Sequence, residues 1–345
     1  MRRLFPLVSL GIFVVVVLVV AFTALPDRNG GGGDGGDGGD PAEREATQVD
    51  RKVLAISLDG LNPDALAKLG PAKTPNIHRL IDEGASTLNA RTAYEKNITL
   101  PNHTGMVTSD PINADDGGHG VTWNVGDPSK SIDPDEDSVF TVAHEAGLST
   151  GVFVTKQKFE LWERAWKNDI DVFEAVDDHD ELVPETAKDL ADEQRDLTFV
   201  HLSLPDVAGH ASGGMSPDYL DAVEESDAQV GEFLDVIDAD PGLTKDLDVI
   251  LTADHGFKPG ITNHSEKVYE NYRIPFIVWG PDAGAGTDLY ELNADDYRDP
   301  GKGRPDYEGP QPVRNADLGN LALDLLGLGP IETSDIGKSQ ILDVK

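Results

Sequence analysis

Seven widely separated residues have the side chains and local settings that metal ligation requires. They are Asp59, Thr99, Asp206, His210, Asp254, His255 and His264. Carboxylates and imidazoles together suit Zn²⁺ or a similar divalent ion. Two such ions about 4 Å apart can hold the attacking and leaving oxygens of an in-line displacement at phosphorus. The pattern therefore indicates an enzyme.

The three aspartates of this set follow apolar runs that are typical of buried strands. They are Asp59 at the end of 53–59, Asp206 after 197–204, and Asp254 at the end of 248–254. Open α/β sheets place their sites at the carboxyl ends of such strands. We therefore expect the three carboxylates to meet at one edge of a sheet.

The histidines stand close to these aspartates or follow them in the chain. His210 lies four residues after Asp206 in PDVAGH, where a turn could direct both side chains at one ion. A polar loop with a chance histidine is the alternative. His255 directly follows Asp254, and such a pair after a buried strand has little structural purpose. His264 is the only later histidine, although NHSE could also be a solvated loop.

Thr99 is the candidate nucleophile. It lies in NITLPNHTGMVTSD, where a Pro-containing turn leads into a helix of small residues. The positive end of a helix favours an attacking anion. A threonine hydroxyl needs activation, and a metal ion is the simplest activator because no lysine is adjacent in the sequence. The alternative is an ordinary helix N-cap.

Short apolar runs alternate with amphipathic segments, as an α/β fold requires. Besides the three strands above, strands are expected at 150–155 and 274–280. Helices are expected at 74–85, 138–148, 216–238 and 315–328. The first of these should begin at Thr74, with Pro75 at its first position, and end at Gly84. Stretches 110–136 and 282–312 should be surface loops.

The ends and the charge of the chain restrict its location and partners. Residues 1–28 contain an apolar segment after two arginines, long enough to span a bilayer as a single-pass anchor. A cleaved signal peptide is the alternative, and either places the catalytic domain outside the cytoplasm. Residues 29–50 form a Gly/Asp-rich linker, and 51–345 the catalytic domain. The net charge of −35 disfavours a nucleic-acid binding module and suggests adaptation to high salt; calcium binding or simple solubility are the alternatives. Oligomeric state stays open.

The order of LDGLNPD, TPNIHRLIDEGAS, TLPNHTGMVTSD, HGVTWN, PDVAGH and ADHG resembles the alkaline phosphatase superfamily, most closely its type I phosphodiesterase/nucleotide pyrophosphatase branch. The resemblance implies an alkaline-phosphatase-like α/β sandwich with a central mixed, mostly parallel sheet flanked by helices. It also implies two zinc ions. One would be held by Asp206, His210 and His264, and the other by Asp59, Asp254, His255 and the Thr99 oxygen.

The resemblance further implies that Asn124 hydrogen-bonds a phosphoryl oxygen; a simple turn residue is the alternative. Leu100 stands where nucleotide-cleaving relatives usually carry phenylalanine, which weakens a nucleotide as substrate. Only eight residues separate His255 from His264, so the long insertion of those relatives is missing. The site should be more open, or be covered by loops 110–136 and 282–312.

The expected function is hydrolysis of a small phosphoric diester through a threonyl-phosphate intermediate. The nearest alternative is a phosphomonoesterase or phosphonate hydrolase that uses the same metals. A protein of another class, which kept the fold for binding and lost catalysis, is disfavoured because all seven ligand positions are intact.

Overall fold

The computed structural model describes residues 51–345. The expected membrane or signal segment (1–28) and the linker (29–50) lie outside this range. Within the described range, no helix has both the length and the apolar character needed to cross a membrane.

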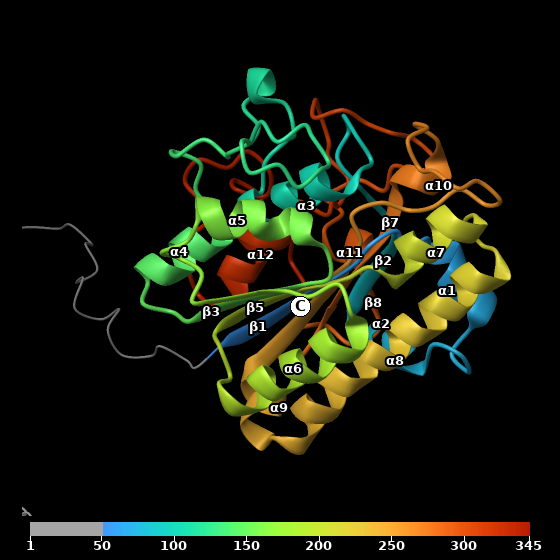
Figure 1. Cartoon of the computed structure of the whole chain (residues 1–345), viewed down its shortest axis with the longest axis horizontal. Coiled ribbons are helices and arrows are strands. Elements are labelled where there is room, and N and C mark those ends of the chain that lie inside the picture. The colour runs from blue at the N-terminus through green and yellow to red at the C-terminus, as the bar shows by residue number, and fades with distance from the viewer. Residues whose placement is uncertain (1–50) are drawn as a thin grey trace, which may run out of the picture. The chain divides into compact units, whose positions relative to one another are not determined.

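An eight-stranded mixed sheet forms the centre of the described chain (Figure 1). Its strands are β1 (Lys52–Leu58), β2 (Ala85–Arg91), β3 (Thr150–Val154), β4 (Val172–Ala175), β5 (Leu197–Leu202), β6 (Leu247–Thr252), β7 (Arg273–Trp279) and β8 (Thr287–Asp288). Their order across the sheet is β4-β3-β5-β1-β6-β7-β2-β8. Only β7 runs antiparallel to its neighbours, β6 and β2. The expected mixed, mostly parallel sheet is therefore confirmed.

The central strands are buried on both faces, which explains their uninterrupted apolar sequences. All residues of β5 and β6 are buried, as are all residues of β1 after the first. The five strands expected from the sequence are confirmed with small shifts of their ends. Three strands were missed: β2 and β4 are only partly buried, and β8 has two residues. None of these carries the apolar run on which the prediction depended.

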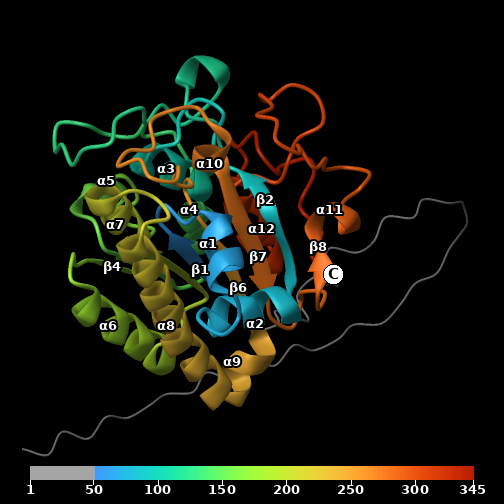
Figure 2. The ribbon, with the colours of Figure 1, turned by 90° about the vertical axis from the view of Figure 1, so that its right-hand side faces the viewer.

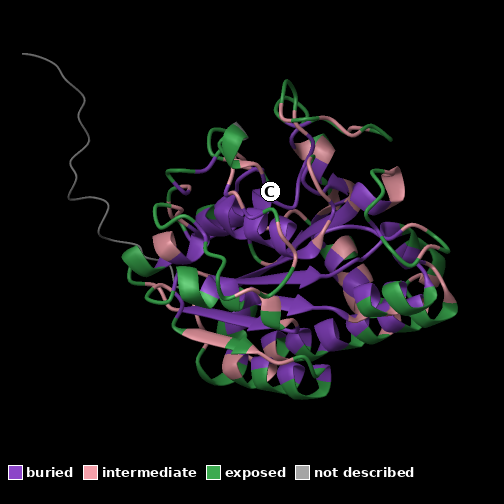
Figure 3. Ribbon diagram, turned by 45° about the horizontal axis from the view of Figure 1, so that its top comes forward, coloured by how far each residue is buried: buried purple, intermediate pink, exposed green. Residues whose placement is uncertain are grey.

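Helices cover both faces of the sheet (Figures 1 and 2). One face carries α3 (Thr99–Thr108), α4 (Val139–Glu145), α5 (Glu160–Ala165) and α12 (Asp317–Leu325). The other carries α1 (Pro63–Leu69), α2 (Pro75–Glu83), α6 (His179–Asp192), α8 (Pro217–Ala239) and α9 (Pro241–Asp246). The short helices α7 (Leu204–Ser212), α10 (Tyr269–Tyr272) and α11 (Leu289–Leu292) complete the fold. Buried residues concentrate in the strands and on the helix surfaces that face them (Figure 3).

The helix ends show where local sequence suffices and where it does not. α2 has Thr74 as its N-cap, Pro75 at its first position and Gly84 after its end, as expected. The Thr74 side chain makes no capping hydrogen bond. The carboxylate of Asp227, on α8, accepts instead from the backbone N–H of Ile77 (2.7 Å). A distant helix therefore supplies the cap of α2.

A buried carboxyl group follows α3 and should make stability depend on pH. Burial and the nearby Glu136 raise the pKa of Asp110 to about 8, although its Oδ1 accepts from Asp335 N (2.8 Å). The folded state then binds more protons than the unfolded state between pH 4 and 8, so the free energy of unfolding falls as pH rises. Asp110→Asn removes the titrating carboxyl group. The variant should therefore have a higher free energy of unfolding than the parent chain, by on the order of 2 kcal/mol at pH 8. Denaturant unfolding at pH 4.5 and pH 8 checks it, and an advantage that does not grow with pH would contradict it.

Candidate active site

Four neighbouring strands deliver charged side chains to one edge of the sheet. In the order β3-β5-β1-β6, the residues that follow the strands include Lys156, Asp206, Asp59 and Asp254. All four strands run parallel, so their carboxyl ends meet at the same edge. The expectation that the three aspartates converge there is confirmed by their contacts, given below.

The turn after β1 brings Asp59 and Asp206 together. Gly60 has φ of +76°, and a Cβ at this position would lie 3.1 Å from the Cα and Cβ of Asp206. Its N–H also donates to Asp254 Oδ1 (3.0 Å). Only glycine combines this backbone conformation with such a close approach. The LDG sequence therefore fixes the positions of three carboxylates relative to one another.

Asp206 and His210 lie on a helix, which corrects the expectation of a turn. They occupy α7, and their four-residue spacing places both on one side of it. His210 Nε2 lies 3.3 Å from Asp206 Oδ1. The apolar strand β5 ends at Leu202, and Pro205 near the start of α7 suits the first turn of a helix. The short segment PDVAGH showed too little periodicity for this helix to be expected.

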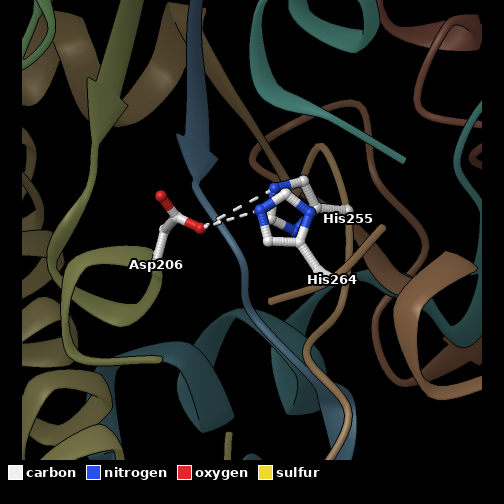
Figure 4. Close-up of side chains that lie close together, drawn as sticks. All are labelled: Asp206, His255 and His264. Carbon is white, nitrogen blue, oxygen red and sulfur yellow. Dashed lines mark ion pairs between the residues drawn. The ribbon is translucent and has the colours of Figure 1, made fainter. Parts of the chain in front are cut away.

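Two further histidines face Asp206 from the loops after β6 (Figure 4). His255 and His264 are stacked with ring centroids 3.6 Å apart. Their Nε2 atoms lie 3.8 and 3.4 Å from Asp206 Oδ1, respectively. His255 Nε2 also lies 3.4 Å from Asp59 Oδ1 and 3.2 Å from Asp254 Oδ2. His255 therefore stands between Asp206 and the other two aspartates.

All three histidines direct their Nε2 atoms at this cluster. Each donates its Nδ1–H to a backbone carbonyl: His210 to Thr262 O, His255 to Gly256 O and His264 to Asn97 O, at 2.9, 3.0 and 2.7 Å. In a neutral ring this leaves the Nε2 lone pair free to bind a cation. Burial lowers the pKa of His255 and His264, whereas the hydrogen bond to Asp206 raises the pKa of His210. Histidines that bind metals usually donate their other ring N–H to a carbonyl or carboxylate in this way.

The buried polar atoms that lack partners mark the same place. Within residues 51–345, nine buried side-chain polar atoms have no hydrogen-bond partner. Four of them are Asp59 Oδ1, Asp206 Oδ1, Asp254 Oδ2 and His255 Nε2. Buried acceptors without a donor are costly, and a cation is the natural partner for a group made only of acceptors. These carboxylate oxygens and the imidazole nitrogen are therefore suitable ligand atoms for a divalent metal ion.

The structure groups the candidate ligands somewhat differently from the two expected sets. Two triads have ligand atoms within 4.8 Å of one another: Asp206–His255–His264 and Asp59–Asp254–His255. Compared with the two expected sets, His255 belongs to both triads and His210 to neither. His210 nevertheless lies beside the first triad, because its Nε2 is 3.2 Å from His264 Nε2. Its side chain is 46% exposed, whereas the other candidate ligands are buried.

The electrostatics of the cluster call for added positive charge. Burial, Asp59 and Asp206 together raise the pKa of Asp254 well above its usual value. Burial and His264 lower the pKa of His255 to about 3, which keeps the ring neutral. For Asp59, burial acts to raise the pKa, but Lys156 and His201 outweigh it and hold the pKa well below the usual value. Neutral imidazoles beside crowded carboxylates are suitable ligands for a divalent ion.

Thr99 is the first residue of α3 and is 2% exposed. The N-cap of α3 is Ile98, and no side chain caps the helix, so the Thr99 hydroxyl has no capping role. Residues on either side hold this turn against the candidate ligands. His103 donates Nδ1–H to Thr99 O and lies 3.6 Å from Asp254 Oδ2, while Asn97 O accepts from His264. Thr99 therefore lies at a helix N-terminus, between Asn97, which is bonded to His264, and His103, which is close to Asp254.

Asn124 lies beside the N-terminus of α3. Its Oδ1 accepts from Leu100 N (2.9 Å) and from Lys158 Nζ (3.2 Å). The backbone N–H of Leu100 is therefore already occupied, and the amide nitrogen of Asn124 stays available as a donor. Lys96 Nζ also donates to Thr122 O (2.7 Å). Thr122 and Asn124 of the loop 110–136 thus contact the start of α3 and the segment before it.

Several residues of the site escaped sequence reasoning. Lys156 bonds Asp59 and Asp206, His201 Nε2 donates to Asp59 Oδ2 (3.0 Å), and His103 accepts from Ser57 Oγ (2.8 Å). No lysine is adjacent to Thr99 in the sequence, but Lys156 reaches the site from the end of β3. Lys156 follows the expected strand 150–155, and the same strand-end criterion that found the aspartates could have found it.

Comparisons with known proteins agree with this fold. The family model of type I phosphodiesterase/nucleotide pyrophosphatase matches residues 53–274. The chain belongs to the type I phosphodiesterase/nucleotide pyrophosphatase family, within the alkaline phosphatase superfamily.

Individual relatives share only part of their length with this chain. Mouse ectonucleotide pyrophosphatase/phosphodiesterase family member 1 is 27% identical over 268 residues, 70% of this chain but 28% of the relative. Rat family member 7 is 25% identical over 254 residues, 66% of this chain and 54% of the relative. GPI ethanolamine phosphate transferase 1 of Yarrowia lipolytica is 30% identical over 174 residues, 47% of this chain and 18% of the relative.

Solved structures show the same fold at low sequence identity. Murine family member 5, solved as an inactive variant in complex with AMP, superimposes with a TM-score of 0.61 at 16% identity. The match covers 85% of this chain and 99% of that one. A protein solved with its substrate D-glucosamine-2-N,6-O-disulfate gives a TM-score of 0.58 at 12% identity, over 85% of this chain and 80% of that one.

Proposed function

We propose that this chain is a two-metal hydrolase of phosphoric diesters that uses Thr99 as its nucleophile. The observation that carries the proposal is the cluster of unpartnered acceptor atoms on Asp59, Asp206, Asp254 and His255. These atoms face one another at the carboxyl edge of the sheet, beside the helix that begins at Thr99. The Asp/His donors favour Zn²⁺.

The proposed ligands are those expected from the sequence. Asp206, His210 and His264 hold one ion, while Asp59, Asp254, His255 and the Thr99 oxygen hold the other. The shared proximity of His255 to both triads is compatible with this division, because its Nε2 lies nearer to Asp254 and Asp59 than to Asp206. Bound metals supply Lewis acidity, which lowers the pKa of an attacking hydroxyl and stabilises charge on a leaving oxygen.

The protein groups position the reaction. The Thr99 hydroxyl gives its proton to solvent water and its oxygen attacks phosphorus in line. An O–P bond forms as the ester bond to the leaving group breaks, and the leaving oxygen takes a proton from solvent. The product is a threonyl-phosphate, which water then hydrolyses to return the threonine. The free amide donor of Asn124 hydrogen-bonds a phosphoryl oxygen, and the N-terminus of α3 favours the developing negative charge. The inactive variant of murine family member 5 carries a threonine-to-alanine substitution, which supports a threonine nucleophile.

One observation favours the alternative, a phosphomonoesterase or phosphonate hydrolase. Lys158 Nζ lies 3.2 Å from Asn124 Oδ1 and so brings a positive charge next to the proposed phosphoryl position. A terminal phosphoryl or phosphonyl group carries more negative charge than a diester and gains more from this lysine. The choice between the two functions therefore concerns substrate charge, with the same nucleophile and metals.

Hydrolysis of two model substrates separates these functions. The purified full-length chain, with Zn²⁺ in high salt, should hydrolyse bis-p-nitrophenyl phosphate faster than p-nitrophenyl phosphate. High salt screens the repulsion expected from a net charge of −35. Release of p-nitrophenolate is the measurement. Faster hydrolysis of the monoester would assign the chain to the alternative, and no metal-dependent hydrolysis of either would contradict both.

We also propose that the catalytic part, residues 51–345, works outside the cytoplasm. The apolar segment within residues 1–28 would anchor it in the cell membrane as a single span, or direct its secretion. The support is the sequence pattern alone, because the segment lies outside the described residues. Fractionation of cells that express the full chain, followed by protease treatment of intact cells, tests the proposal; a protected cytoplasmic pool would contradict it.

A further inference from the structure

Lys156 has no part in the proposed reaction, yet it lies at the centre of the site. It follows β3 and its side chain is 17% exposed. Its Nζ donates to Asp59 Oδ2 (2.5 Å) and to Asp206 Oδ2 (2.7 Å). These carboxylates belong to different triads, so one ammonium group spans both candidate metal positions.

In Asp59 and in Asp206, the two carboxylate oxygens contact different groups. The Oδ2 atoms of Asp59 and Asp206 bond Lys156. The Oδ1 atoms have no hydrogen-bond partner and face the imidazoles instead. Asp59 Oδ1 lies 3.4 Å from His255 Nε2, and Asp206 Oδ1 lies 3.3 Å from His210 Nε2. The ammonium group thus holds each carboxylate from the side that does not face the ligand cluster.

We propose that Lys156 is a positioning residue that couples the two metal sites by holding one carboxylate ligand of each. The inference rests on the proposed function, because it takes the triads to be metal sites. The ammonium group fixes the rotation of both carboxylates and keeps each Oδ1 directed at its ion. Hydrogen bonds behind ligating groups commonly contribute about 10- to 100-fold to metal affinity.

The contacts also predict that the two sites depend on Lys156 unequally. Asp59 Oδ2 accepts a second hydrogen bond, from His201 Nε2 (3.0 Å). For Asp206 Oδ2, the ammonium group of Lys156 is the hydrogen-bond donor, at 2.7 Å. Loss of the lysine should therefore release Asp206 more than Asp59. The ion bound by Asp206, His210 and His264 should lose more affinity than the other ion.

Two other roles for Lys156 predict different outcomes. If its ammonium group occupied the position of a metal ion, removing it would make metal binding tighter. Its attachment to the Oδ2 atoms, away from the unpartnered Oδ1 atoms, opposes this role. If Lys156 only bound substrate, its removal would raise KM and leave metal affinity unchanged.

Metal titration of the full-length chain tests the inference without relying on activity. Metal-free protein is titrated with Zn²⁺ in competition with a chromophoric chelator, for the parent chain and for Lys156→Met and Lys156→Gln. The matched control is Lys158→Met, because Lys158 contacts Asn124 rather than either carboxylate. Circular dichroism shows which variants fold, and glutamine keeps a polar side chain of similar length should methionine prevent folding.

The expected result is two bound ions in every folded variant, with one dissociation constant raised about 10- to 100-fold in the Lys156 variants. The second constant should rise less, and Lys158→Met should match the parent chain. Zinc affinity in the Lys156 variants equal to or tighter than that of the parent would overturn the inference. Failure of the parent chain itself to bind two ions would instead contradict the proposed function.

Discussion

Thr99→Ala should reduce kcat/KM for the preferred phosphoric ester by roughly 10⁴-fold or more, as expected when a nucleophile is removed. The fold should persist, because Ile98 rather than Thr99 is the N-cap of α3 and the lost hydroxyl caps no helix. Steady-state rates, together with a circular dichroism melt of the same preparation, provide the measurement.

Thr99→Ser is the matched control for this experiment. Serine keeps the hydroxyl and removes only a methyl group, so it should retain far more activity than alanine. A radiolabelled phosphoryl group should become trapped on the parent chain and on the serine variant, and not on the alanine variant. Near-normal turnover by Thr99→Ala would refute the assignment of the nucleophile, even if the metals proved essential.

Removal of the metals should have the second large effect, on activity and on stability together. Dialysis against a chelator should abolish hydrolysis, because Thr99 then lacks its activator. The melting temperature should fall as well. An ion that binds only the folded state, present at a concentration of about a thousand times its dissociation constant, adds about 4 kcal/mol to the free energy of unfolding. Without it, the unpartnered acceptors of Asp59, Asp206 and Asp254 face one another.

Return of Zn²⁺ to the dialysed protein should restore both the hydrolysis rate and the melting temperature. His255→Ala provides a genetic counterpart, because His255 Nε2 contacts acceptors of both triads. This variant should resemble the metal-free parent chain and gain little from added Zn²⁺. Full hydrolysis in excess chelator, or a melting temperature that does not respond to zinc, would count against a metal enzyme.

The central strands could be predicted from the sequence, because burial on both faces imposes apolar runs such as VLAISL and DVILT. The carboxylates at the ends of these runs could be predicted to lie together, because a parallel sheet brings its strand ends to one edge. The turn expected at PDVAGH was wrong. Its helix, α7, is stabilised by its position after β5 and against α8 rather than by a strong local pattern.

The seven candidate ligands could be predicted from the sequence, because residue type and position after a strand indicate their chemistry. Their arrangement in space could not be predicted. Whether His255 served one ion or stood between two, and which oxygen of each carboxylate was free, depended on contacts between segments up to two hundred residues apart. Lys156 shows this most clearly: two carboxylates define its role, and neither is near it in the sequence. The sequence by itself determined the chemistry available at the sheet edge, because residue types and strand patterns are local properties. Only the tertiary structure decided how that chemistry is oriented, because side-chain direction depends on partners that folding brings together.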